Sequence, residues 1–207
     1  GKLILGEAYV KWYRTQQYYD SGQWRGTWEL DGGGCLMNQG VHTVDCLQWV
    51  MGGVAEVTAQ TALLAHEKIE VEDIAQALLK FKNGAVGTII ASTAVYPGMD
   101  ERIEVSGTKG TMIMNKSDIV FRKIMGEEEP ADMGGKTERG SGAADPQAIT
   151  NEGHVAQIQD FCQAIAENRD PMITGEDGRK PLEIILAVYQ SARTGKPVKL
   201  PLKRKKK

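Results

Sequence analysis

The sequence predicts an α+β fold, in which a run of antiparallel strands comes first and a helical layer follows. Apolar and polar residues alternate with a period of two through most of residues 54–124, whereas residues 151–168 and 179–195 have helical spacing. Strands and helices therefore occur in blocks, which favours an antiparallel sheet over repeated strand–helix–strand units. With 207 residues, 41% of them hydrophobic, we expect one domain over residues 1–202 and a disordered basic tail at 203–207.

The first quarter of the chain contains a strand, an irregular segment and a helix. Residues 3–13 alternate like a strand, and the aromatic-rich segment 14–34 has no clear period. Long unpatterned segments are often functional. A helix is predicted from about Gly34 to Met51, where Gly52 and Gly53 end it.

The middle of the chain predicts one large sheet. Asn83 and Gly84 form a tight hairpin turn between two alternating segments, and residues 107–110 form another turn. The predicted strands cover residues 54–64, 72–81, 85–95, 101–107, 111–115 and 118–124. Five or more strands in one sheet need a covering layer.

Two helices follow a polar, glycine-rich connection at residues 126–148. The first, 151–168, carries apolar residues at helical spacing: Val155, Ile158, Phe161, Cys162 and Ile165. The second, 179–195, has Pro181 in its expected first turn and Gly195 at its end.

Composition excludes several classes of function. The net charge is −2, but without the tail Lys203–Lys207 the body carries 20 basic and 27 acidic residues, or −7, which argues against nucleic-acid binding. No apolar run is long enough to span a membrane. The three cysteines, Cys35, Cys46 and Cys162, are far apart and lack a CxxC pair, so we expect no disulfide framework, no metal site and a cytoplasmic location.

One polar stripe on the predicted helix 34–51 is a candidate for chemistry. Asn38, His42, Asp45 and Trp49 follow one another at spacings of four, three and four, so they share a face. They either face water or lie beneath another element. The second is favoured, because Asp45 is the only charged side chain between residues 32 and 55.

Such a stripe suits oxidation of a carbinol. Neutral imidazole at His42 can take a hydroxyl proton near pH 7, and Asn38 can hold the same hydroxyl by a hydrogen bond. Asp45 can fix the tautomer of His42 or cap local backbone. The glycines at 32–34 allow either a close approach of the backbone or a tight entry to the helix.

A cofactor site is not visible in the chain. There is no G-x-G-x-x-G after a strand and no G-x-x-x-x-G-K-[ST], so neither a dinucleotide fingerprint nor a phosphate-binding loop is predicted.

The order of several segments resembles the C-terminal domain of Gfo/Idh/MocA-type oxidoreductases, the group of glucose-fructose oxidoreductase and inositol dehydrogenase. The resemblance covers essentially the whole chain and rests on WRGTWELDGGG, GGGCLMNQGVHTVDCLQWVMG, VEDIAQALLKFKNGAVGTI, IEVSGTKGTM, GHVAQIQDFCQAI and GEDGRKPLEIILAVYQSARTGKPVKLP. It implies an open sheet covered on one face by helices, which contributes to the substrate site and to homo-oligomerisation. It also implies an N-terminal Rossmann domain, absent from this chain, that binds NAD or NADP.

The resemblance assigns roles to individual residues. His42 falls on the family's catalytic histidine, and Asn38 falls where many members carry Asp, which leaves it hydrogen bonding rather than a carboxylate role. The family's catalytic lysine lies in a Glu-Lys-Pro motif that this chain lacks, so the chain alone is expected to be inactive. Its Asn-Gln pair is similar to that of members acting on sugars or nucleotide sugars.

Further substrate contacts are expected from aromatic and basic side chains. Trp12 and Trp24 offer faces for sugar rings, and Arg14 and Arg25 suit carboxylate or phosphate, although sheet packing and loop anchoring explain these residues equally well. His154 either reaches the site or simply begins its helix. His66 lies in a polar turn and receives no role.

Three functions are consistent with these features. The first is a substrate-binding and oligomerisation domain of an NAD(P)-dependent sugar, polyol or nucleotide-sugar dehydrogenase. The second is a non-catalytic assembly or binding module, which the absence of cofactor motifs favours. The third is an NAD-dependent glycoside hydrolase.

Overall fold

The computed structural model describes residues 1–128, 143 and 151–203, and it confirms the α+β class. The strands are β1 Leu3–Lys11, β2 Val54–Ala62, β3 Ile74–Phe81, β4 Val86–Ser92, β5 Arg102–Gly107, β6 Gly110–Asn115, β7 Asp118–Ile124 and β8 Val198–Lys199. The helices are α1 Gln16–Asp20, α2 Cys35–Asn38, α3 Val41–Met51, α4 Glu152–Glu167 and α5 Gly175–Thr194. The predicted connection 126–148 and basic tail lie mostly outside the described residues.

The strands form one open sheet in the order β7-β6-β5-β1-β4-β3-β2-β8. All neighbouring strands are antiparallel except β1 and β4, which run parallel, so the first strand is inserted into the middle of the later ones. The hairpin turn between β3 and β4 is as predicted, with Gly84 at a positive φ of 87°.

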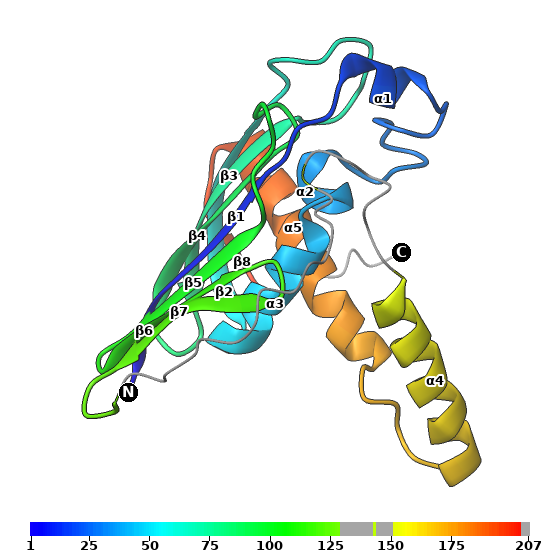
Figure 1. The fold of residues 1–207 in the computed structure, drawn as a ribbon. Helices are drawn as coiled ribbons and strands as arrows, with labels where there is room; N and C mark the ends of the chain where they lie inside the picture. Colours follow the sequence, from blue (N-terminus) through cyan, green and yellow to red (C-terminus); the bar gives the residue numbers. More distant parts are fainter. Residues whose placement is uncertain (129–142, 144–150, 204–207) are drawn as a thin grey trace.

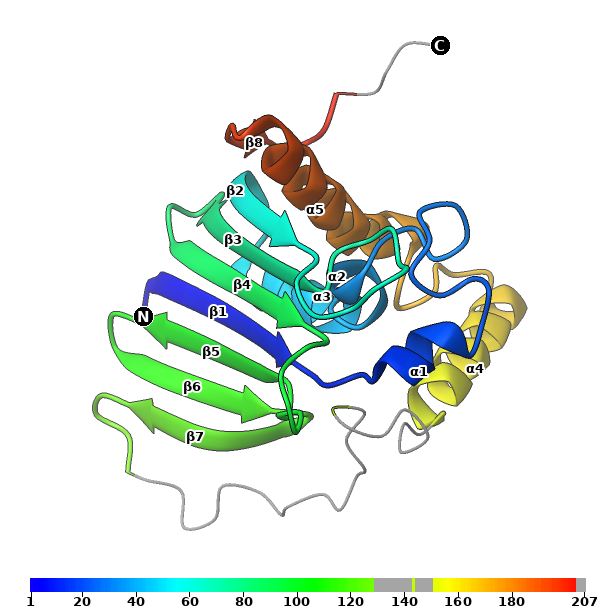
Figure 2. The same ribbon diagram turned by 90° about the horizontal axis from the view of Figure 1, so that it is seen from above.

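Helices cover one face of this sheet, and the other face is open in the described part of the chain (Figures 1 and 2). α3 and α5 pack together and against β1, β2 and β5. The core between these layers includes Val57, Leu79 and Ile89 from the sheet and Leu47 and Ile185 from the helices. Burying such side chains contributes about 1.5–3 kcal/mol each.

Two predicted helices begin or end elsewhere. Residues 34–51 form two helices, α2 and α3, because Gln39 and Gly40 interrupt the predicted single helix. α5 begins four residues before the predicted start at Arg179, where Thr174 and Asp177 form a capping box. Pro181 therefore lies inside the helix and not in its first turn.

α4 projects from the body in Figure 1. Its apolar residues have the predicted helical spacing, but Val155, Ile158, Phe161 and Ile165 are all exposed, and Ala164 is its buried residue among those described. No helix of the described residues is long and apolar enough to cross a membrane.

Candidate functional site

The junction of α2 and α3 separates the two residues predicted to be catalytic. The Gly40 amide donates to the Cys35 carbonyl 2.9 Å away, five residues back instead of four, before α3 resumes with Val44 bonding to Gly40. A Cβ at Gly40 would lie 2.9 Å from the Leu36 carbonyl oxygen, so the tight junction favours glycine. Asn38 ends α2 and His42 occupies the first turn of α3, so they do not share one regular helix face.

Glu72 fixes the start of α2. Its carboxylate oxygens accept hydrogen bonds from the amides of Gly34 and Leu36, each at 3.0 Å, and from the Tyr189 hydroxyl at 3.0 Å. Burial raises the pKa of Glu72, and these donors only partly offset it. The position of Glu72 also explains the glycine at the end of the run, because a Cβ at Gly34 would lie 1.9 Å from the Glu72 carbonyl oxygen. The run therefore permits a close approach between elements of this chain.

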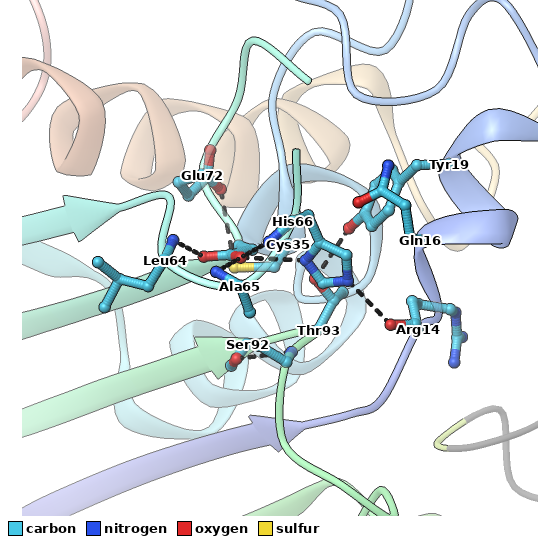
Figure 3. Close-up of polar contacts among 12 residues, drawn as sticks. Arg14, Gln16, Tyr19, Cys35, Leu64, Ala65, His66, Glu72, Ser92 and Thr93 are labelled. Carbon is cyan, nitrogen blue, oxygen red and sulfur yellow. Dashed lines mark hydrogen bonds and ion pairs between the residues drawn. The ribbon is translucent and has the colours of Figure 1, made fainter. Parts of the chain in front are cut away.

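Asp73, the next residue, holds a different segment, whose residues Leu64, Ala65 and His66 are labelled in Figure 3. Its carboxylate accepts hydrogen bonds from the amides of Leu64, Ala65 and His66 at 2.8–3.0 Å, and it lies 3.0 Å from His66 Nδ1. Burial alone would raise the pKa of Asp73, but these donors outweigh it and hold the pKa below its ordinary value.

His66 connects this cluster to the end of the first strand. Its Nε2 lies 2.8 Å from the Arg14 carbonyl oxygen, and the ring of Tyr19 packs edge-on against it at 4.7 Å. Both ring nitrogens therefore lie against oxygen atoms that accept hydrogen bonds. His66, which the sequence left without a role, is a buried structural residue that positions the segment around Arg14.

His42 has the opposite surroundings. It is exposed, and no hydrogen bond or ion pair joins it to another residue of the described part. Asp45 accepts a hydrogen bond from Gln48 at 3.0 Å, so it does not orient His42 in this structure. Trp49, on the same side of α3, is 80% exposed, so the cover expected over this stripe is not supplied by the described residues.

Asn38 is held by its neighbours. Its Nδ2 donates to Asp31 Oδ1 at 2.6 Å, while its Oδ1 accepts from Gln39 Nε2 at 2.9 Å. Asp31 also accepts from the Gly26 amide at 3.0 Å, which ties the loop to α2. One N–H of Asn38 is left for another partner.

Four of the predicted substrate contacts gather around one tyrosine. The Arg14 guanidinium lies 5.0 Å from the Trp12 ring and 5.3 Å from Tyr18, and that of Arg25 lies 4.8 Å from Tyr18 and 4.6 Å from Trp24. Arg14 is only 4% exposed, and its Nη1 donates to the carbonyls of Tyr13 and Ala143. Arg14 therefore has a structural role at least.

The remaining predicted contact, His154, is exposed in the first turn of α4 and has no hydrogen bond to another described residue.

Reasoning from the sequence missed Glu72 and Asp73. Two acids at the start of an alternating strand were an available signal, because at least one of them must be buried. Gln39, Asp31 and Tyr18 carried no such signal.

Known proteins share this fold. Residues 4–200 match the family described as "Oxidoreductase family, C-terminal alpha/beta domain". The WlbA dehydrogenase of Bordetella pertussis, solved with NADH and UDP-GlcNAcA, is 32% identical with a TM-score of 0.80, covering 98% of this chain and 56% of that one. The WlbA dehydrogenase of Chromobacterium violaceum, solved with the same ligands, is 33% identical with a TM-score of 0.81, over 99% and 56% of the two chains.

Among curated relatives, myo-inositol 2-dehydrogenase of Thermotoga maritima is 28% identical over 81% of this chain and 49% of its own length. An uncharacterized oxidoreductase of Bacillus subtilis, YrbE, is 32% identical over 81% and 48%. The chain thus spans about half the length of the curated relatives it matches. It belongs to the Gfo/Idh/MocA oxidoreductase family and corresponds to that family's C-terminal α/β domain.

Proposed function

We propose that this chain is the substrate-binding domain of an NAD(P)-dependent dehydrogenase that oxidises a secondary hydroxyl of a sugar, polyol or nucleotide sugar, with His42 as the proton acceptor. The observation that carries the proposal is the state of His42: an exposed imidazole without a partner among the described residues, in a fold whose relatives include dehydrogenases. An imidazole with a free nitrogen is available to a substrate hydroxyl.

The division of labour follows from what the chain contains. No dinucleotide fingerprint or Glu-Lys-Pro motif occurs in it, so the cofactor and the catalytic lysine are proposed to belong to a second domain, without which this chain is inactive. The bound nicotinamide supplies hydride acceptance; NAD is favoured because the WlbA structures hold NADH. His42 takes the hydroxyl proton, and Asn38, anchored by Asp31, donates its remaining N–H to the substrate.

The substrate class is inferred from relatives and from the loop. The WlbA structures hold a nucleotide sugar, whereas other relatives are named for inositol and apiose. Trp24 is exposed beside Arg25, as a stacking surface for a sugar ring requires.

The experiment is turnover of the full-length protein containing this chain with NAD and NADP against sugars, polyols and nucleotide sugars. We expect His42→Ala to lower kcat by about 10²–10⁴-fold, the usual contribution of a general base. His154→Ala, at the other exposed histidine, tests the remaining predicted substrate contact separately. Full activity in His42→Ala contradicts the assignment of the base.

We also propose that the open sheet face joins two copies of the protein. Leu78, in the second half of β3 on this face, is 67% exposed, and its neighbours include Gln76 and Thr88, a mixture of apolar and polar residues suited to a subunit interface. Sedimentation velocity of Leu78→Arg should show a smaller particle than the unchanged protein. An unchanged sedimentation coefficient contradicts this interface.

A cytoplasmic location stays a prediction. Cys46 and Cys162 are exposed free thiols, which persist in a reducing compartment.

A further inference from the structure

The guanidinium of Arg25 has aromatic neighbours but no acidic one. Its faces are near Tyr18 and Trp24, an arrangement that leaves the N–H groups at its edge for hydrogen bonds. No ion pair of the described residues includes Arg25, and its hydrogen bond to Ser21 Oγ is long, at 3.4 Å. Its Nε is buried without a hydrogen-bond partner among the described residues. Leaving a buried charged donor unsatisfied is costly, so this site is suited to an incoming acceptor.

Local charge points to the sign of that acceptor. The Arg14 and Arg25 guanidinium groups both approach the Tyr18 ring, at 5.3 and 4.8 Å from its centroid, so two positive charges adjoin one side chain in a chain whose body is acidic. The carboxylate of Asp31 is engaged with the Gly26 amide and Asn38. An anion at Arg25 would be attracted by the positive charge of its guanidinium group.

The hydroxyl end of Tyr18 carries a second unsatisfied group. Gln39 is only 7% exposed, and its Nε2 donates to Asn38 Oδ1 at 2.9 Å and approaches the Tyr18 hydroxyl at 3.4 Å. These bonds fix the orientation of the amide, since the reverse orientation would set two oxygens against each other. Gln39 Oε1 is buried and has no hydrogen-bond partner in the described part of the chain, so it can accept a hydrogen bond from a ligand donor.

We propose that Arg25, Tyr18 and Gln39 form a recognition site for a sugar that carries an anionic substituent, a carboxylate or a phosphate. Arg25 binds the anion through its edge, and Gln39 Oε1 accepts a hydrogen bond from a sugar hydroxyl. This inference rests on the proposed function, because it names the substrate class of the same site. Neutral polyols are therefore expected to bind more weakly, since they carry no anionic group for Arg25.

The test is calorimetric binding to the full-length protein, which reports on the site without requiring turnover. Four probes separate the sources of the anion: UDP-GlcNAcA with carboxylate and diphosphate, UDP-GlcNAc with diphosphate alone, N-acetylglucosaminuronic acid with carboxylate alone, and neutral myo-inositol. Arg25→Met is compared with Arg25→Lys, which restores the charge without the planar edge. Thermal unfolding confirms that both variants are folded.

We expect Arg25→Met to weaken binding of UDP-GlcNAcA at least tenfold, or about 1.4 kcal/mol, with partial recovery in Arg25→Lys. The single-anion probe that loses affinity identifies which group Arg25 binds. Gln39→Leu should weaken the same probes, while NADH binding stays unchanged in every variant. Affinities of all three anionic probes within twofold of the unchanged protein in Arg25→Met overturn the proposal, as does failure of every anionic probe to bind.

The two proposals fail separately. Loss of anion binding in Arg25→Met supports this site even if no substrate is turned over. Unchanged binding of the anionic probes in Arg25→Met, together with turnover that depends on His42, overturns the anion site and leaves the dehydrogenase intact.

Discussion

His42 and His66 are 24 positions apart in the sequence and lie in opposite environments. Both nitrogens of His66 are bonded, to Asp73 and to the Arg14 carbonyl, whereas His42 has no partner among the described residues. A bonded histidine contributes to stability, because its loss leaves other polar groups unsatisfied. An unbonded one contributes to chemistry, because its nitrogen is free for a substrate. Four substitutions, taken from the largest expected change in unfolding free energy to the smallest, test this contrast.

His66→Ala should have the largest effect. It removes one member of a buried pair and leaves Asp73 and the Arg14 carbonyl short of a donor, so we expect a loss of about 3–5 kcal/mol in the free energy of unfolding. Equilibrium urea unfolding at pH 7 measures it. A loss below 1 kcal/mol would mean that solvent replaces both hydrogen bonds.

Glu72→Gln should lower the free energy of unfolding by less, about 1–3 kcal/mol. Glutamine keeps one oxygen that can accept a hydrogen bond, but its NH₂ group would face a backbone N–H at the start of α2, where the carboxylate has an oxygen. The effect depends on pH. Burial raises the pKa of Glu72 in the folded protein above its ordinary 4.5. The stability that this shift contributes is therefore fully present below pH 4.5 and is lost as the pH rises through the folded pKa. The stability difference between the unchanged protein and Glu72→Gln should therefore be larger at pH 4 than at pH 7. The reverse trend would place the folded pKa below 4.5.

Tyr19→Phe should cost about 1 kcal/mol, the usual value of one hydrogen bond. The change keeps the ring that packs against His66 and removes the hydroxyl that lies 2.8 Å from Thr93 Oγ1. Thr93→Ser is the matched control, because serine keeps the hydroxyl group that bonds to Tyr19 and removes only a methyl group. Equal losses in the two variants would assign the effect to packing.

His42→Ala should change the unfolding free energy by less than about 0.5 kcal/mol, as for other exposed side chains without partners. The same urea unfolding measures this small change. Together with the expected loss of kcat in His42→Ala, it would distinguish a histidine that acts in catalysis from one that stabilises the fold. A destabilisation comparable with that of His66→Ala would refute the contrast.

Local patterns predicted the sheet better than they predicted the site. The alternation of β3 and β4 and the Asn83-Gly84 turn were readable because both depend on neighbouring residues. His66 was not, because its partners lie seven and 52 positions away and meet only when β1 and β3 join the same sheet on either side of β4. The break at Gly40 was missed because one glycine inside an apolar helical pattern does not show whether the helix continues.

The adjacency of Glu72 and Asp73 also has a consequence for motion. Two consecutive residues just before β3 accept hydrogen bonds from two separate segments: Glu72 from the Leu36 amide of α2, and Asp73 from the Leu64 amide of the loop after β2. A fluctuation that frays this end of the strand releases both amides together, so they should exchange with deuterium at the same rate as one cooperative unit. The loop that carries Arg25 and the turn that carries His66 would then open and close in concert.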